Sequence, residues 1–194
     1  KILSKSSLNN SIVNLNVEEF KKNINKINER NEKVTENQMS NMANIHKSIL
    51  IAKDQCKDLV YFVEDDYLHN EDTFEEMILT YERISSQFKK ELILCPADYP
   101  YLYNKINPTN ILLGSTKHWR VVTETLCTFL TSVNVLEKYC DKLINMCQFE
   151  HYPFEKPLHE IYESEYCLSP IPSLAIHCTN VNSVFGLSPN VDWE

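Results

Sequence analysis

Apolar and polar residues follow one another along the chain in segments that predict helices and strands in alternation. Apolar residues three or four positions apart predict amphipathic helices over residues 17–27, 41–56 and 74–84. Thr131 and Ser132 predict the cap of a further helix over residues 133–147, and a short helix is expected at 158–162. Uninterrupted apolar runs predict strands over residues 59–63, 91–95 and 172–177, and a pair spaced as in a hairpin at 111–113 and 119–122. This rhythm is typical of α/β domains, so we expect one domain spanning residues 1–194 with helices on a sheet.

The apolar run at 59–63 leads directly into three carboxylates, Glu64, Asp65 and Asp66. A run of this kind predicts a strand with both faces covered, as at the centre of a parallel sheet. Ligands of open α/β sheets bind beyond the carboxyl ends of the strands. Because adjacent acids repel one another and lose solvation there, we expect Mg²⁺ or Mn²⁺ to compensate them. A solvated acidic turn that caps the next helix is the alternative.

Composition narrows the classes of partner. The net charge of −8 argues against nucleic acid, and no apolar stretch is long enough for a membrane span. The seven cysteines are scattered without a Cys-x-x-Cys pair, which favours a reducing compartment and no zinc site. We therefore expect a cytoplasmic protein, with a peripheral position at the membrane left open. Only two glycines occur, which excludes the glycine-rich phosphate loops, so metal and side chains would hold the phosphates of any nucleotide.

The acidic triplet at the end of an apolar strand resembles the "DXD" motif of GT-A glycosyltransferases, which use nucleotide-sugar donors. The resemblance spans about residues 40–180, and the E-D-D form is similar to that of N-acetylglucosaminyltransferases and family-2-like transferases. It implies a Rossmann-like, mixed but mainly parallel sheet flanked by helices. It also implies that Asp66 ligates the metal, that Glu64 faces the donor's ribose or a metal-bound water, and that His177 completes the metal shell. For His177, a strand-end histidine satisfied within the protein is the alternative. Asp192 and Trp193 resemble a tail that closes over the site.

The same resemblance places Glu155 where inverting members carry their catalytic base, in a loop stiffened by Pro153 and Pro157. An ordinary acid at a helix N-terminus is the alternative. Asp98 competes for the catalytic role or binds acceptor hydroxyls, and Glu124 is a further competitor. Arg120 is a candidate for the donor's pyrophosphate, with Glu64 and Asp65 assisting at the metal. Nitrogen beside oxygen ligands favours Mn²⁺ slightly over Mg²⁺.

These residues predict an inverting, metal-dependent hexosyltransferase that moves a sugar from a nucleotide-sugar donor to a hydroxyl of a carbohydrate or other acceptor. The strand–helix–strand unit with which the family recognises the base has little counterpart in residues 1–40, so we expect that part to be truncated or diverged. Two other functions stay open. One is a non-catalytic carbohydrate- or partner-binding module on a degenerate GT-A fold, and the other is metal-dependent phosphoryl or nucleotidyl transfer.

Overall fold

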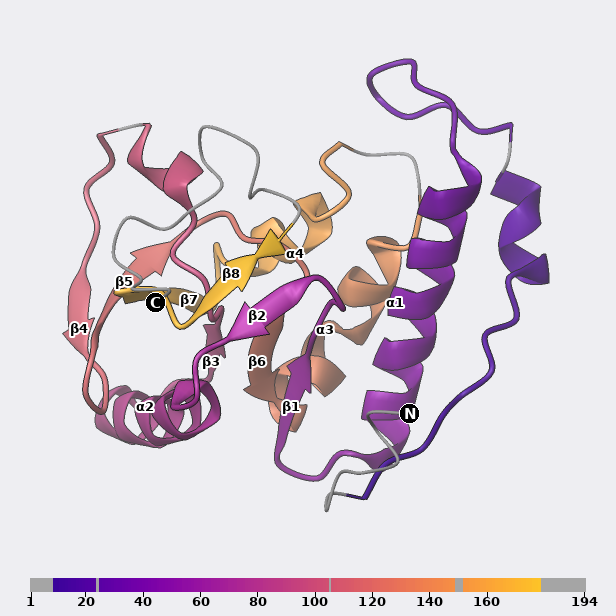
Figure 1. Ribbon diagram of the computed structural model, residues 1–194. Coiled ribbons are helices and arrows are strands. Elements are labelled where there is room, and N and C mark those ends of the chain that lie inside the picture. Colours follow the sequence, from indigo (N-terminus) through magenta and orange to yellow (C-terminus); the bar gives the residue numbers. More distant parts are fainter. Residues whose placement is uncertain (1–8, 24, 105, 149–151, 179–194) are drawn as a thin grey trace.

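Six short strands form the main sheet of the structure, a computed structural model that describes residues 9–23, 25–104, 106–148 and 152–178 (Figure 1). In chain order the strands are β1 Leu59–Phe62, β3 Leu92–Leu94, β4 Ile111–Leu113, β5 His118–Val122, β6 Phe129–Ser132 and β7 Tyr166–Ile171. They lie side by side in the order β1-β6-β3-β7-β5-β4. A second sheet pairs β2, Tyr67–His69, with β8, Ala175–His177.

The main sheet is mixed, and β3 and β7 are its one parallel pair of neighbours in the described chain. The predicted α/β class and mixed sheet are confirmed, including the hairpin of β4 and β5, whereas the expected mainly parallel pairing is not found. β1, β3 and β7 nevertheless run in one direction, because β6 is antiparallel to both β1 and β3. The segments that follow these three strands therefore all leave from the same end of the sheet, at the C-terminal ends of these strands.

β1 lies at an edge of this sheet and not at its centre, which corrects the prediction for residues 59–63. Its strand partner among the described residues is β6, with Leu59 opposite Ser132. Val60 belongs to one core cluster and Tyr61 packs against the other, so both faces of the strand are covered. A continuous apolar run indicates that both faces of a strand are buried. It does not indicate how many neighbouring strands pair with it, because hydrogen bonds between strands use only the backbone.

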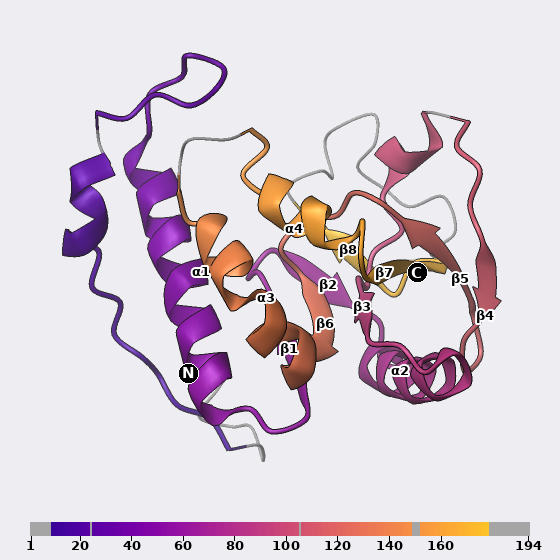
Figure 2. The same cartoon turned by 180° about the vertical axis from the view of Figure 1, so that it is seen from behind.

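Helices cover both faces of the main sheet (Figures 1 and 2). The helical segments are η2 Glu18–Asn23, α1 Glu36–Gln55, α2 Thr73–Phe88, η3 Pro100–Tyr103, α3 Val133–Asn145 and α4 Lys156–Ile161. α1, α3 and α4 contribute to the core on one face, and α2 packs on the other. The amphipathic helix predicted at 17–27 is only the short 3₁₀ segment η2. None of the described helices is both long and apolar enough to cross a membrane.

Local sequence explains where the longer helices begin. Thr35 and Gln38 form a capping box, so α1 starts five residues before the apolar spacing that predicted it at 41–56. The hydroxyl of Ser132 accepts a hydrogen bond from the backbone N–H of Val135, which caps α3 as predicted. α1 ends at Gln55 and the chain turns back into β1, which brings the acidic triplet alongside the helix.

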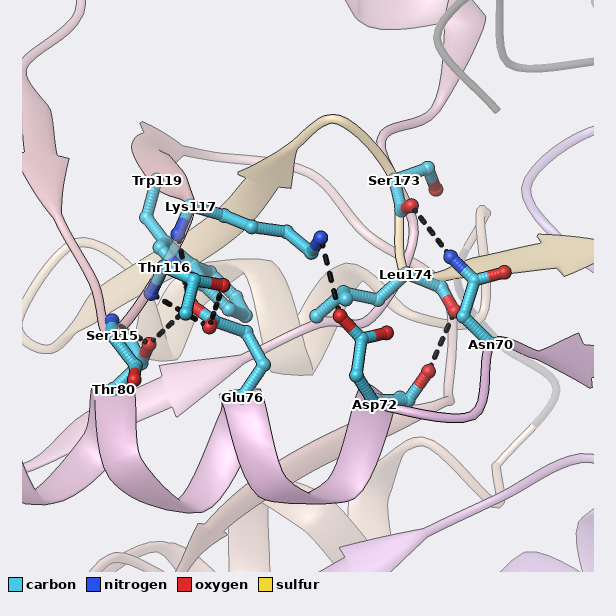
Figure 3. A network of polar contacts seen from close by, with 11 residues as sticks. Asn70, Asp72, Glu76, Thr80, Ser115, Thr116, Lys117, Trp119, Ser173 and Leu174 are labelled. Atoms are coloured by element: carbon cyan, nitrogen blue, oxygen red, sulfur yellow. Dashed lines mark hydrogen bonds and ion pairs between the residues drawn. The ribbon is translucent and has the colours of Figure 1, made fainter. Parts of the chain in front are cut away.

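A buried carboxylate joins α2 to the turn between β4 and β5 (Figure 3). Glu76 is 3% exposed and accepts hydrogen bonds from the backbone N–H and hydroxyl of Thr116 at 2.8 and 2.6 Å. The indole N–H of Trp119 and the hydroxyl of Thr80 donate to it at 3.1 and 2.9 Å, and the backbone N–H of Lys117 at 3.3 Å. Burial by itself would raise the pKa of Glu76, but these hydrogen bonds outweigh it and lower the pKa. Glu76 thus links the hairpin to α2, and the ion pair of Lys117 with Asp72 at 3.3 Å adds a second charged contact.

Candidate functional site

The acidic triplet lies in the turn between β1 and β2, on the wall of a cavity of about 410 Å³. The cavity is bounded by one face of α1, by Phe62 and Val63, by Glu64, Asp65 and Asp66, and by Cys127 and Phe129 near the start of β6. Its volume falls within the range of small-molecule sites in proteins. The predicted placement of the triplet at the carboxyl end of a strand is therefore confirmed, and the cavity gives the three acids a common space.

Asp66 and His177 meet through the pairing of β2 with β8. Tyr67 stands opposite His177 in that ladder, and the backbone N–H of Cys178 donates to the carbonyl of Asp66 at 2.7 Å. Nε2 of His177 lies 2.9 Å from Oδ2 of Asp66, and the ring of Tyr67 stacks on the imidazole with centroids 4.8 Å apart. The predicted approach of Asp66 to His177 is confirmed. That the pair holds a metal ion stays a prediction.

The residues present fit a divalent cation in two respects. Oδ1 of Asp66 is buried and has no hydrogen-bond partner within the described chain, which costs ~1–3 kcal/mol unless a ligand compensates it. Nε2 of His177 and Oδ2 of Asp66 are hydrogen-bonded at 2.9 Å, a separation that two ligand atoms ~2.1 Å from one ion also have when they meet it at about a right angle, so an ion would replace this hydrogen bond. No group of three His, Cys, Asp or Glu residues in the described part is arranged to hold a metal. The pair would therefore rely on substrate phosphates to complete the coordination, as Mg²⁺ sites commonly do.

The pKa of Glu64 shows that negative charge is concentrated in this pocket. This pKa is raised to about 7, chiefly by burial and also by the negative charge of Asp66, Glu155 and Asp65. The hydroxyl of Thr128 opposes this and accepts a hydrogen bond from the backbone N–H of Glu64 at 3.0 Å. The charged neighbours with the largest effect on Glu64 are thus all carboxylates. Such a concentration of negative charge favours a bound cation.

Glu155 precedes α4 and is 6% exposed. Its side chain makes no capping hydrogen bond to the helix, which disfavours the alternative of a simple capping acid. Burial raises its pKa to about 7, and its charge acts on Glu64. Glu155 is not among the described residues that line the cavity, so its link to the acidic triplet is the effect of its charge on Glu64. A carboxyl with a pKa near 7 is suited to accept a proton at neutral pH.

This raised pKa predicts a pH-dependent stability effect. The folded-state pKa of Glu155, about 7, lies above the ordinary 4.5, so its contribution to stability is full below pH 4.5 and is lost as the pH rises through 7. Above pH 7 the buried charge should cost roughly 3 kcal/mol, at 1.36 kcal/mol per pKa unit. Glu155→Gln should therefore stabilise the fold by about that amount at pH 8 and by much less at pH 5, as measured by urea unfolding.

The exposed Glu163 offers a matched control, because Glu163→Gln changes the same chemical group in solvent near the same helix. It should alter the free energy of unfolding by less than ~0.5 kcal/mol at either pH. An equal gain from Glu155→Gln at both pH values would show that Glu155 does not carry a buried charge at pH 8.

Asp98 and Arg120 form a separate cluster outside the cavity. Nη2 of Arg120 donates to Oδ1 of Asp98 at 2.5 Å, and the hydroxyl of Tyr103 donates to Oδ2. The guanidinium also lies over the ring of Tyr103, 4.3 Å from its centroid. Burial raises the pKa of Asp98 although both partners oppose the shift. The predicted acceptor-side acid and the predicted pyrophosphate-binding cation thus neutralise each other, and their catalytic and donor-binding roles stay predictions.

Sequence reasoning missed residues that support the site. Tyr67 directly follows the triplet, and besides stacking on His177 its hydroxyl lies 2.6 Å from that of Tyr99, which stacks on Tyr101. Thr128, the residue before β6, contacts Glu64. The signal for Tyr67 was its position in the strand after the triplet, whereas nothing local marked Thr128. The predicted closing tail, Asp192 and Trp193, lies outside the described residues.

No model of a protein family matches the chain, and a comparison with curated proteins found no match. The basis for a functional proposal is therefore the chemistry and geometry of the residues themselves.

Proposed function

We propose that this chain is a GT-A-like, metal-dependent glycosyltransferase domain that transfers a sugar from a nucleotide-sugar donor to an acceptor hydroxyl with inversion. The observation that carries the proposal is the contact of Asp66 with His177. Oδ1 of Asp66 is buried and lacks a partner in the described chain, and the neighbouring acids of the triplet lie on a cavity wall. β1 and β3 run in the same direction, so the segments after both strands lie at one end of the sheet. Substrates of open α/β sheets bind at this end, which supports a site beside the acidic triplet.

Asp66 and His177 would hold Mn²⁺ or Mg²⁺, and the nitrogen ligand slightly favours Mn²⁺. The ion would supply Lewis-acid stabilisation to the diphosphate that leaves the sugar. Glu64, whose backbone is fixed by Thr128, would face the donor's ribose or a water on the ion. Asp65 is exposed beside them on the cavity wall and would assist through its charge.

Glu155 would act as the general base. As the acceptor oxygen forms its bond to the anomeric carbon, Glu155 takes the hydroxyl proton, and the bond from that carbon to the diphosphate oxygen breaks with its electron pair. Attack from the side opposite the diphosphate inverts the anomeric centre. The raised pKa of Glu155 supports this role, because a carboxyl with an ordinary pKa would be a weaker base at neutral pH.

A thermal shift experiment tests the proposal. Mn²⁺ together with a nucleoside diphosphate, from a panel of UDP, GDP, CDP and ADP, should raise the melting temperature by about 5–10 °C at concentrations ~100-fold above Kd. Either component alone should have little effect, because each needs the other to complete the coordination shell. Asp66→Asn should abolish the shift, whereas Asp54→Asn, at an exposed position on α1, should leave it unchanged.

The alternatives give different results in the same experiment. A non-catalytic module would be stabilised by a carbohydrate without metal or nucleotide. A phosphoryl- or nucleotidyl-transfer enzyme would be stabilised by Mn²⁺ and a nucleoside triphosphate, and would release phosphate or pyrophosphate from it. A shift that survives Asp66→Asn would refute the assignment of the metal site.

A further inference from the structure

The cavity beside the acidic triplet continues along α1. Four uncharged polar residues of that helix line it, Ser40, Asn41, Asn44 and Ser48. Their spacing of three or four residues places them on one face, in a stripe ~12 Å long at 1.5 Å per residue. Phe62 at the end of β1 and the triplet that follows it line the same cavity, so the stripe shares this space with them.

The chemistry of this wall differs from that of the triplet. Among the described residues that line the cavity, the charged side chains are those of Glu64, Asp65 and Asp66, and there is no lysine or arginine. The stripe itself carries amides and hydroxyls, and within the described chain these four side chains make no hydrogen bond to protein. Asn41 and Asn44 are exposed. A wall of this kind is unsuited to bind phosphate directly, but it offers paired donors and acceptors to a neutral polar group.

An aromatic side chain shares the cavity with the stripe. Phe62 lines it as the last residue of β1, and its ring is steadied by Phe129, with centroids 5.2 Å apart. Amide side chains that read hydrogen-bonding edges, next to an aromatic ring on which a base stacks, are the means by which proteins recognise nucleobases. One side of the cavity thus carries uncharged amides, hydroxyls and an aromatic ring, which suit a nucleobase. The other side carries the carboxylates of the triplet, which suit a cation.

We infer that the stripe of α1, with Phe62, binds the nucleoside part of the donor, while its diphosphate lies toward Asp66. The inference rests on the proposed function and adds the site of the base and ribose to it. It assigns to α1 a task that the sequence placed in residues 1–40, where little of the family's base-recognising unit could be found. The order along the cavity is then nucleoside at α1, diphosphate at the triplet, and sugar beyond it.

Comparing a nucleotide with bare pyrophosphate separates this inference from the proposed function. Binding of UDP, GDP, CDP, ADP and inorganic pyrophosphate is measured by calorimetry in the presence of Mn²⁺. The wild-type chain should bind at least one nucleotide more tightly than pyrophosphate. Asn44→Ala should weaken that nucleotide ~3–10-fold, the worth of a hydrogen bond or two, and leave pyrophosphate unchanged. Ala favours the helix, so the variant keeps its fold.

Asn37→Ala is the matched control, since Asn37 is an exposed asparagine of the same helix that does not line the cavity. It should change neither affinity. If Asn44→Ala and Asn41→Ala leave nucleotide binding intact, or weaken pyrophosphate equally, the inference is overturned. Mn²⁺-dependent pyrophosphate binding without any preference for a nucleotide also overturns it, yet leaves the metal site standing. A wild-type chain that binds neither ligand refutes the proposed function and the inference together.

Discussion

Glu155→Gln should lower the turnover of sugar transfer by ~10²–10⁴-fold, the usual contribution of a positioned general base. The amide keeps the size of the side chain and removes its basicity, so Mn²⁺-dependent nucleotide binding should stay nearly intact. Release of nucleoside diphosphate from the donor, followed in the presence of acceptor, measures the rate. The same variant is expected to be more stable than the wild type at pH 8, so a loss of rate there does not reflect unfolding.

Two results would change the assignment of the base. Unchanged turnover in Glu155→Gln would transfer the role to Asp98 or Glu124. Of these, Asp98 is already bonded to Arg120 and Tyr103, so it would have to release its partners to take a proton. Loss of nucleotide binding together with turnover would instead show that Glu155 positions the donor. Glu163→Gln, in solvent, should retain full turnover and serves as the control.

Glu76→Ala should reduce the free energy of unfolding by ~3–5 kcal/mol, because several donors lose a charged acceptor and one of them, the indole N–H of Trp119, is buried. The donors are the indole of Trp119, the backbone and hydroxyl of Thr116 and the backbone of Lys117. Urea unfolding at pH 7 measures the loss. Glu75→Ala, at the exposed neighbouring position on α2, should change stability by less than ~0.5 kcal/mol.

The effect of Glu76 should depend on pH. The folded-state pKa is lowered, so the stability that Glu76 contributes is present above the ordinary pKa of 4.5 and is lost as the pH falls through the folded value. The difference between the wild type and Glu76→Ala should therefore shrink in strongly acidic solution. A difference that stays constant from pH 7 to pH 3 would mean that packing, and not the charged hydrogen bonds, explains the loss.

Sequence patterns predicted the strands and helices whose signal is local. β1, β3 and the β4–β5 hairpin were each marked by a compact apolar run, and α3 by its cap at Ser132. β7 was missed although it lies inside the sheet, because Pro170 within it is unusual for a paired strand. The residue stands opposite Trp119 in the ladder with β5. β6 was missed because its last residues were read only as the start of α3.

Some contacts of the candidate site were likewise predicted from the sequence, and others were missed. The contact between Asp66 and His177 was predicted from the expectation that each ends an apolar strand, but the antiparallel pairing of β2 with β8 that produces it was not predicted. The ion pair of Asp98 with Arg120 was not predicted either, because it depends on β7 standing between β3 and β5. The polar stripe of α1 was also missed, since apolar spacing identifies the buried face of a helix and leaves the ligand-facing side unmarked.

The order β1-β6-β3-β7 has a consequence for how the chain folds. β6 separates β1 from β3, although it follows both by many residues, and β7 comes later still. Neither early strand gains a partner until the second half of the chain has been synthesised. Such distant pairings slow folding, toward the millisecond-to-second range of β-rich domains. A nascent chain that stops before residue 129 would expose two unpaired apolar strands, the kind of edge that aggregates and that chaperones bind.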